Sequence, residues 1–207
     1  MKKGRLIVIS GPSGVGKGTV VRALMERDAN VRLSVSATTR EMRPSEVHGV
    51  HYYFISRAEF EAMIAADRFL EYAQYVGNCY GTPEEPVDRM LDEGFDVILE
   101  IEVQGGLQVM QRRPDAISIF IAAPSFAVIG ARLRGRGDTD EEKVLMRLQQ
   151  ARQEYLVAPQ YQYIVVNDRL EDAVNDVQAI LRAEALKSEH QQHLLKEAHS
   201  YALSPHE

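Results

Sequence analysis

The sequence contains one cysteine, no tryptophan and no long apolar run. The lone Cys79 excludes an intramolecular disulfide framework and a zinc site built from several cysteines, so we expect a reducing, cytoplasmic setting. The apolar stretch that begins at Leu6 ends at Gly11. It is too short for a signal sequence or a membrane span, and we expect no contact with a membrane.

A surplus of positive charge is also missing. The formal net charge of the 207 residues is -6 at pH 7, whereas a protein that coats a nucleic acid needs a broad basic surface. We therefore expect no nucleic-acid partner, and an anionic substrate would have to meet positive charge gathered locally. With 45% apolar residues, the chain can bury a full core as one domain that carries inserted subdomains.

Short apolar runs alternate with longer amphipathic stretches along the chain. The runs are rich in β-branched residues, as buried parallel strands are, and their alternation with helical stretches predicts an α/β fold. The four strands expected are residues 6–10, 97–101, 117–122 and 164–166. Between residues 40 and 80 the pieces are shorter and richer in tyrosine, which predicts an inserted small subdomain.

Helix starts are marked by capping boxes, in which a hydroxyl side chain is followed three positions later by an acid. The three expected starts are Ser56 with Glu59, Thr82 with Pro83 and Glu85, and Thr139 with Glu142. Gly94 fits the C-terminal cap of the second of these helices. The polar stretch 135–140 predicts a mobile connection between two helices.

Residues 11–19 read GPSGVGKGT and directly follow the expected strand 6–10. A strand, such a loop and a helix form the context of a P-loop, whose glycines let backbone N–H groups turn towards phosphate oxygens. Lys17 is expected to reach the β and γ phosphates and to serve catalysis, so the loop predicts ATP or GTP binding. The nucleotide-binding residues expected here are Gly11, Pro12, Ser13, Gly14, Val15, Gly16, Lys17, Gly18 and Thr19.

Gly18 departs from the usual P-loop, which has at this position the Ser or Thr that holds magnesium. Thr19 follows one residue later. GKGT loops of this kind also occur in nucleoside monophosphate kinases such as adenylate kinase. That similarity implies Mg²⁺ as the cofactor that accompanies ATP, held mainly by phosphates and water, with no direct protein ligand.

Six further motifs lie at separate places in the chain. They are SVSATTR at 34–40, Arg43, EVHGVHYYF at 46–54, EYAQYVGNCYGT at 71–82, LEIEVQG at 99–105 and GRG at 135–137. By these motifs and the P-loop, the chain resembles the guanylate kinase family over roughly residues 4–185. The resemblance implies ATP-dependent phosphorylation of GMP, and of dGMP, with ATP and GMP as substrates.

The same resemblance implies a P-loop three-layer fold with a central parallel sheet, an inserted small mixed subdomain that binds the nucleoside monophosphate, and a helical lid. The core is expected at about residues 4–36, 95–134 and 155–185. The GMP-binding subdomain is expected at about 37–94, the lid at about 135–154 and a helical tail at about 186–207. That tail either meets a second subunit, giving a homo-oligomer, or is a frayed solvated end.

The phosphate of GMP is a dianion, and bidentate guanidinium groups with hydroxyl donors beside them suit it. By similarity, the residues that hold it are Arg40, Arg43, Tyr52 and Tyr80. Taken singly, the arginines are ordinary surface charges and the tyrosines are packing residues. Their joint match to the spacing of one family favours the phosphate site.

Guanine presents N1–H and N2–H donors beside its O6 acceptor, so a carboxylate facing these donors favours guanine and repels adenine. The resemblance places Glu71 and Glu102 there, Thr82 near O6 and Ser36 close by. Many relatives have Asp at the position of Glu102 and Tyr at that of Cys79. The alternative for Glu102, as for Glu100, is a polar residue at the carboxyl end of a strand, which is where ligands of α/β sheets bind in any case.

Phosphoryl transfer needs in-line positioning, magnesium and positive charge over the equatorial oxygens, but no general base when the acceptor is already an anion. By similarity, Arg136 and Arg147 are the catalytic arginines and Arg132 lies near ATP. Asn167 and the neighbouring Asp168 are candidates for contacts with adenine. For Arg134 the preferred interpretation is a solvated helix face.

Two other functions remain open at this point. One is a ribose-bisphosphate kinase on the same fold, against which the base-reading Glu71, Thr82 and Glu102 argue. The other is a guanylate-kinase-like module that binds proteins and has lost catalysis. The intact P-loop glycines and lysine and the two lid arginines favour an enzyme.

Overall fold

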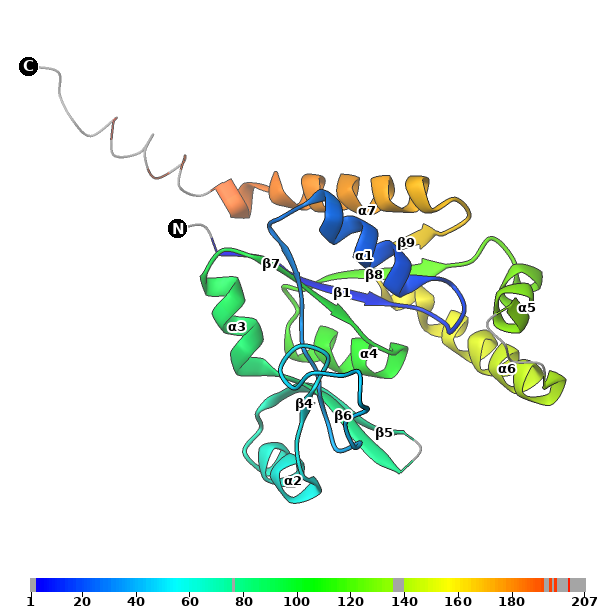
Figure 1. Cartoon of the computed structure of the whole chain (residues 1–207). Helices are drawn as coiled ribbons and strands as arrows, with labels where there is room; N and C mark the ends of the chain where they lie inside the picture. The colour runs from blue at the N-terminus through cyan, green and yellow to red at the C-terminus, as the bar shows by residue number, and fades with distance from the viewer. Residues whose placement is uncertain are drawn as a thin grey trace, which may run out of the picture.

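The computed structural model describes residues 3–75, 77–135 and 140–191, together with residues 194, 196 and 201. Its central sheet is parallel throughout, with the strand order β2-β7-β1-β8-β9 (Figure 1). The strands are β1 (Leu6–Ser10), β2 (Val31–Leu33), β7 (Asp96–Glu100), β8 (Ile117–Ala122) and β9 (Tyr163–Val166). The four strands expected from the sequence are confirmed to within one residue, and β2 adds a fifth.

Helices cover both faces of this sheet, because side chains along each strand alternate between the faces. Ile7 and Ile9 of β1 pack among the buried residues of the helices α1 and α7. Leu6 and Val8 point the other way, towards α3 and α4. The bounds are α1 (Lys17–Arg27), α3 (Glu84–Asp92), α4 (Val103–Arg112) and α7 (Leu170–Ala185). The three-layer α/β fold is therefore confirmed.

A second, mixed sheet of four strands follows the order β4-β3-β6-β5. It consists of β3 (Ala37–Thr38), β4 (Tyr53–Phe54), β5 (Phe69–Tyr75) and β6 (Asn78–Pro83), with α2 (Arg57–Ala65) beside it. Its own small core contains Phe60 stacked on Phe69 with 4.5 Å between ring centroids, and the buried Cys79. Cys79 is thus a packing residue of the mixed sheet.

The remaining helices are α5 (Phe126–Gly135) and α6 (Glu141–Val157), followed by the short 3-10 segments η1 (Ala158–Gln160) and η2 (Ser188–Gln191). Val144 and Ala151 of α6 are buried in the same core as α1 and α7. Within the described part of the chain, no helix is long and apolar enough to cross a membrane.

The capping predictions met different outcomes. The capping box of Ser56 and Glu59 at the start of α2 is confirmed. The box at Thr82 is wrong: α3 begins two residues later with Pro83 as its N-cap, because Thr82 belongs to β6 and its hydroxyl donates to Glu71.

The N-cap of α6 is Asp140, whose side chain accepts from the Glu142 N–H. It lies one residue beyond the predicted Thr139, which is outside the described residues. Gly94 does end α3, with φ of 96°. Its N–H donates to the Leu91 carbonyl, as a C-terminal glycine cap requires.

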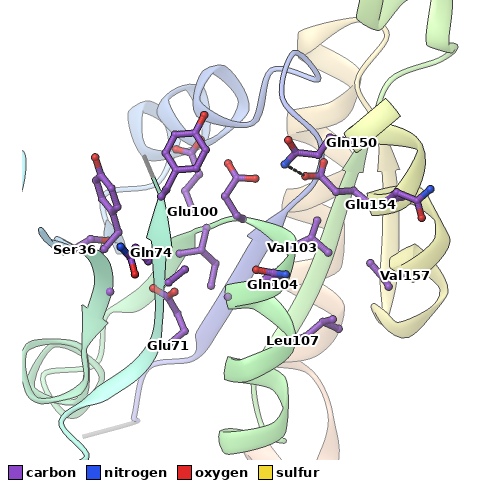
Figure 2. Close-up of a pocket in the computed structure, with 18 of the residues that line it drawn as sticks. Ser36, Glu71, Gln74, Glu100, Val103, Gln104, Leu107, Gln150, Glu154 and Val157 are labelled. Atoms are coloured by element: carbon purple, nitrogen blue, oxygen red, sulfur yellow. Dashed lines mark hydrogen bonds between the residues drawn. The ribbon is translucent and has the colours of Figure 1, made fainter. Parts of the chain in front are cut away.

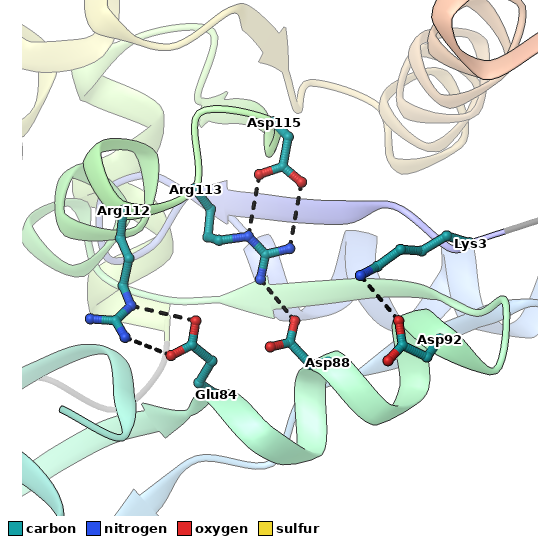
Figure 3. Close-up of polar contacts among 7 residues, drawn as sticks. All are labelled: Lys3, Glu84, Asp88, Asp92, Arg112, Arg113 and Asp115. Atoms are coloured by element: carbon teal, nitrogen blue, oxygen red, sulfur yellow. Dashed lines mark hydrogen bonds and ion pairs between the residues drawn. The ribbon is translucent and has the colours of Figure 1, made fainter. Parts of the chain in front are cut away.

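Helix α3 joins the mixed sheet to the central sheet and is tied to the latter. Val87 and Leu91 on one face are part of the core under the central sheet. Another face carries three acids, each of which forms an ion pair with a cation at the end of α4 or before β1 (Figure 3). The pairs are Glu84 with Arg112, Asp88 with Arg113, and Asp92 with Lys3. The boundaries expected for the subdomains remain predictions.

Candidate active site

The loop between β1 and α1 has the backbone that a phosphate cradle requires. Gly11, Gly14 and Gly16 have φ angles of 145°, 88° and 90°, which side-chain-bearing residues rarely adopt. A Cβ on Gly11 would also lie 2.3 Å from the Ile121 carbonyl oxygen. Because Gly16 is the N-cap of α1, the loop turns backbone N–H groups and the positive end of the helix dipole towards one place.

Lys17 is the first residue of α1 and lies folded over this loop. Its ammonium donates to the carbonyl oxygens of Gly11 and, at 3.3 Å, of Pro12. Phosphate oxygens are stronger acceptors than these neutral carbonyls, because the donor (the ammonium) and the acceptor (the phosphate oxygen) then both carry a charge. The cation expected from the sequence is therefore at the loop, while Ser13 and Thr19 are exposed at its rim.

Asn167 and Arg132, both expected near ATP, lie behind the loop and support it. The buried Asn167 amide donates to the Val15 carbonyl at 2.8 Å. Arg132 donates to the same carbonyl at 3.2 Å and to the Asn167 carbonyl at 3.0 Å. A Cβ on Gly16 would lie 2.6 Å from the Asn167 side-chain nitrogen. These contacts fix the back of the loop, and direct contacts of either residue with ATP remain a prediction.

Gly18 leaves room for a carboxylate. A Cβ at this position would lie 3.2 Å and 3.4 Å from the two carboxylate oxygens of Glu100, the last residue of β7. Burial raises the pKa of Glu100 and the nearby Lys17 lowers it in part. Together with Glu102, these side chains line a small pocket at the loop. A negative group therefore faces the loop at the position where many P-loops have a hydroxyl.

A larger pocket of about 690 Å³ opens beside the loop (Figure 2). One wall comes from the mixed sheet, the floor from the end of β7 and the start of α4, and the opposite wall from α6. Glu100, Ile101 and Glu102 line both this pocket and the small pocket at the P-loop. The two pockets therefore meet at the carboxyl end of β7, at the edge where α/β sheets bind ligands.

Glu71 lies in the wall formed by the mixed sheet and is 7% exposed. Its Oε1 accepts from the Thr82 hydroxyl at 2.6 Å, and its Oε2 lies 2.7 Å from where a Cβ on Gly105 would stand. Burial raises the pKa of Glu71, while the hydrogen bonds from Thr82 lower it in part. Thr82 thus holds Glu71 in place, and its expected contact with guanine O6 remains a prediction.

The aromatic residues expected at the phosphate lie together. The rings of Tyr52 and Tyr80 are 6.1 Å apart in an edge-to-face arrangement, and both line the larger pocket with Ser36. The guanidinium of Arg40 stands 5.6 Å from the Tyr52 ring centroid and pairs with Glu46 at 2.7 Å. Arg43 is exposed on the adjoining loop. The structure therefore places Tyr52 and Tyr80 in the pocket wall and Arg40 beside Tyr52, and the backbone of Arg43 joins them through Glu46; the phosphate contact of all four remains a prediction.

Helix α6 supplies the opposite wall through Gln150, Gln153, Glu154 and Val157. Glu154 accepts from the Gln150 amide at 2.8 Å through one oxygen. Its other oxygen is buried without a hydrogen-bond partner among the described residues, and burial raises the pKa of Glu154. Arg147 is exposed on the same helix, whereas Arg136, also predicted to be catalytic, lies outside the described residues.

Comparison with known proteins decides the family. The family model described as guanylate kinase matches residues 3–184. The chain belongs to the guanylate kinase family. It is 50% identical over 187 residues to a guanylate kinase of Carboxydothermus hydrogenoformans, an alignment that covers 90% of this chain and 92% of that protein. It is equally identical over 188 residues to a guanylate kinase of Halalkalibacterium halodurans, with coverage of 91% and 92%.

A solved guanylate kinase shares the fold. The crystal structure of guanylate kinase from Anaplasma phagocytophilum matches with a TM-score of 0.71 and 33% sequence identity. The match covers 90% of this chain and 88% of that chain. The resemblance inferred from the six motifs and the P-loop is therefore confirmed for the family and for the α/β fold.

Four residues of the site were not predicted from the sequence. Glu46 begins the motif EVHGVHYYF. Its position shortly after Arg40 and Arg43 in the sequence was the only signal that it contacts them. Glu100 was interpreted as one of the polar residues at a strand end. Gly105 gives space to Glu71 and lies in the motif LEIEVQG. Glu154 lies 83 positions beyond Glu71 (154 minus 71), and no pattern in the sequence links the two.

Proposed function

We propose that this protein transfers the γ-phosphoryl group of ATP to the phosphate of GMP, giving ADP and GDP. The observation that carries the proposal is the pair of pockets that meet at Glu100 and Glu102. One pocket belongs to a P-loop, and the other has a carboxylate, Glu71, and two tyrosines, Tyr52 and Tyr80, in its walls, with the Arg40 guanidinium beside Tyr52. Guanylate kinases at 50% identity over about nine-tenths of the chain support the same reaction.

The reaction needs little covalent chemistry from the chain. Lys17 and the N–H groups of the P-loop would hold the ATP phosphates, while Arg40 and Arg43 hold the acceptor phosphate beside them. Arg147 and Arg136 would neutralise the charge on the transferred group once α6 closes over the site. Glu71 would accept from guanine N1–H and N2–H and so select the base.

Magnesium fits this site as a partner of ATP. Among the described residues, no three His, Cys, Asp or Glu side chains gather into a metal site, and Gly18 offers no hydroxyl. Phosphates and water would be the main ligands, and the Glu100 carboxylate, which faces Gly18, lines the same small pocket. When bound, the ion would supply positive charge that neutralises the ATP phosphates.

The deciding experiment is a screen of phosphoryl acceptors. The purified protein is mixed with ATP, Mg²⁺ and GMP, dGMP, AMP, CMP, UMP or ribose 1,5-bisphosphate, and ADP formation is followed. We expect turnover with GMP and dGMP, and none with Lys17→Ala as the matched inactive variant. Absence of turnover with every acceptor would instead indicate the protein-binding module. The use of dGMP, the cytoplasmic setting and an assembly through residues 186–207 remain predictions.

A further inference from the structure

Glu46 is an acid that contacts Arg40 and Arg43, the two arginines expected to bind a phosphate dianion. Every other residue from 41 to 48 is exposed, whereas Glu46 is half-buried and its side chain is 13% exposed. A carboxylate repels a nearby dianion. Glu46 therefore weakens binding of the acceptor nucleotide unless it also has a favourable effect on that binding that exceeds the repulsion.

The carboxylate of Glu46 holds parts of two arginines at once. Its Oε1 accepts from the Arg40 guanidinium at 2.7 Å, and its Oε2 accepts from the backbone N–H of Arg43 at 2.8 Å. The hydrogen bond from Arg40 first, and then that from Arg43, lowers the pKa of Glu46 to about 2. Glu46 is therefore charged at any pH near neutrality, and it fixes the spacing between the two arginine positions.

Arg40 is held from its other sides as well. Its guanidinium donates to the Glu41 carbonyl at 2.7 Å and stands 5.6 Å from the ring centroids of both Tyr52 and Phe54. Only 18% of the Arg40 side chain is exposed. The guanidinium is thus ordered in the free protein, before any phosphate reaches it.

We propose that Glu46 is a positioning residue that preorganises Arg40 and the backbone of Arg43 for the phosphate of the acceptor nucleotide. The proposal rests on the proposed function and assigns Glu46 no contact with the substrate. A long arginine side chain loses rotamer freedom when it binds a ligand, and ordering it in advance removes that loss from the binding step. The repulsion is reduced because the charge of Glu46 is already neutralised by Arg40.

The first test compares GMP with guanosine, which lacks the phosphate, as ligands in calorimetric titrations. Glu46→Gln keeps the size of the side chain but turns a donor towards Arg40, so we expect GMP to bind roughly 10-fold more weakly and guanosine to bind as before. The matched control is Glu61→Gln. Glu61 also accepts from an arginine, Arg57, at 2.9 Å, but it lies on the exposed face of α2, and its variant should bind GMP like the wild type.

The second test asks whether Glu46 acts through Arg40. In steady-state assays with saturating ATP, Glu46→Gln should raise KM for GMP with little change in kcat, and Glu46→Asp, which keeps the charge, should recover part of the loss. Adding Glu46→Gln to Arg40→Ala should cost at most about twofold more than Arg40→Ala alone, because the partner is already gone.

Three results would overturn the inference. Equal loss of GMP and guanosine binding in Glu46→Gln would make Glu46 a residue of loop folding only. Unchanged or tighter GMP binding by Glu46→Gln, or a double variant whose loss equals the sum of the losses of Glu46→Gln and Arg40→Ala, would also contradict it. Binding needs no turnover, so the two proposals fail separately. A wild type that binds GMP without phosphorylating it contradicts only the proposed function.

Discussion

Under the proposed function, the burial of Glu71 costs stability and adds specificity for the base. A carboxylate that is 7% exposed is held by the Thr82 hydroxyl and backbone, and its second oxygen lies against Gly105 in the pocket wall. A buried polar site rejects a wrong base strongly, because the mismatch leaves its own groups unpaired. In the proposed complex, guanine would offer two N–H donors to this carboxylate, whereas adenine would present a lone pair at N1.

Glu71→Gln should therefore weaken the preference for GMP. The substitution keeps the size and replaces one acceptor oxygen by a donor, so the ratio of kcat/KM for GMP over AMP should fall by roughly 10-fold to 1,000-fold, the effect of one or two lost charge-assisted hydrogen bonds. Arg43→Ala is the control: it should remove a contact with the phosphate, which GMP and AMP share, so kcat/KM should fall equally for both nucleotides. Equal losses for both nucleotides in Glu71→Gln would make Glu71 a structural carboxylate.

The raised pKa of Glu71 predicts how stability changes with pH. Burial raises the pKa of Glu71 in the folded state above its ordinary value of 4.5. The folded protein therefore binds more protons than the unfolded chain, and stability falls as pH rises through this range. Glu71→Gln removes that loss. Its free energy of unfolding should match that of the wild type below about pH 4 and exceed it at pH 7, as urea unfolding at several pH values would measure. A variant less stable than the wild type at pH 7 would contradict this sign.

Single residues mark the limit of what the sequence predicts. Lys17, Glu71 and Tyr80 could be placed in the site because each stands in a motif with fixed spacing. Thr82 was expected to cap a helix, since a hydroxyl followed by an acid three positions later fits that pattern. Its partner is Glu71, 11 positions earlier, and that neighbour follows only from the antiparallel pairing of β5 and β6. The sequence neighbourhood of Glu154 likewise does not show that it faces the pocket.

At the scale of elements, three of the four strands that were predicted, β1, β7 and β8, are buried along nearly their whole length, and the fourth, β9, is an edge strand whose sequence YIVV is still apolar. All five residues of β1 and all six of β8 are buried, which gives an unbroken apolar run. β2 has only three residues, VRL, of which only Val31 is buried. Its place at the sheet edge depends on pairing with β7, 65 positions further along at Val31 and Asp96, and no local pattern encodes that pairing.

The ion pair between α3 and Arg113 should contribute measurably to stability. Arg113 is 16% exposed and pairs with Asp88 at 2.9 Å and with Asp115 at 3.2 Å (Figure 3). Arg113→Ala leaves two acids without their cation and should lower the free energy of unfolding by about 1–2 kcal/mol.

Arg57→Ala provides the comparison for Arg113→Ala. Arg57 and Glu61 form an exposed pair one turn apart on α2, with 56% and 61% of their side chains exposed, and such pairs contribute about 0.3–0.5 kcal/mol. Urea unfolding of both variants tests the difference. Similar effects would show that the Arg113 pairs add nothing beyond an ordinary surface contact.

At the scale of the whole molecule, each part of the predicted site carries at least one cation. The loop after β3 carries Arg43 beside the Arg40–Glu46 pair, the P-loop carries Lys17, and α6 carries Arg147. Acids line the space between the walls as well: Glu71, Glu102 and Glu154 all face the larger pocket. Cations repel one another until phosphates neutralise them, so we expect the walls to stand apart in the free protein and to approach when both nucleotides are bound.

Small-angle scattering tests this closure. A compact chain of this length has a radius of gyration of about 17 Å, and the free protein should lie above the value measured with GMP and a non-hydrolysable ATP analogue together. Guanosine with the same analogue is the control, because it is expected to fill the base site without bringing the phosphate that is predicted to meet Arg40 and Arg43. It should leave the radius near that of the ATP analogue alone. An unchanged radius with both nucleotides, or equal contraction with guanosine, would show that charge neutralisation at the acceptor phosphate does not drive closure.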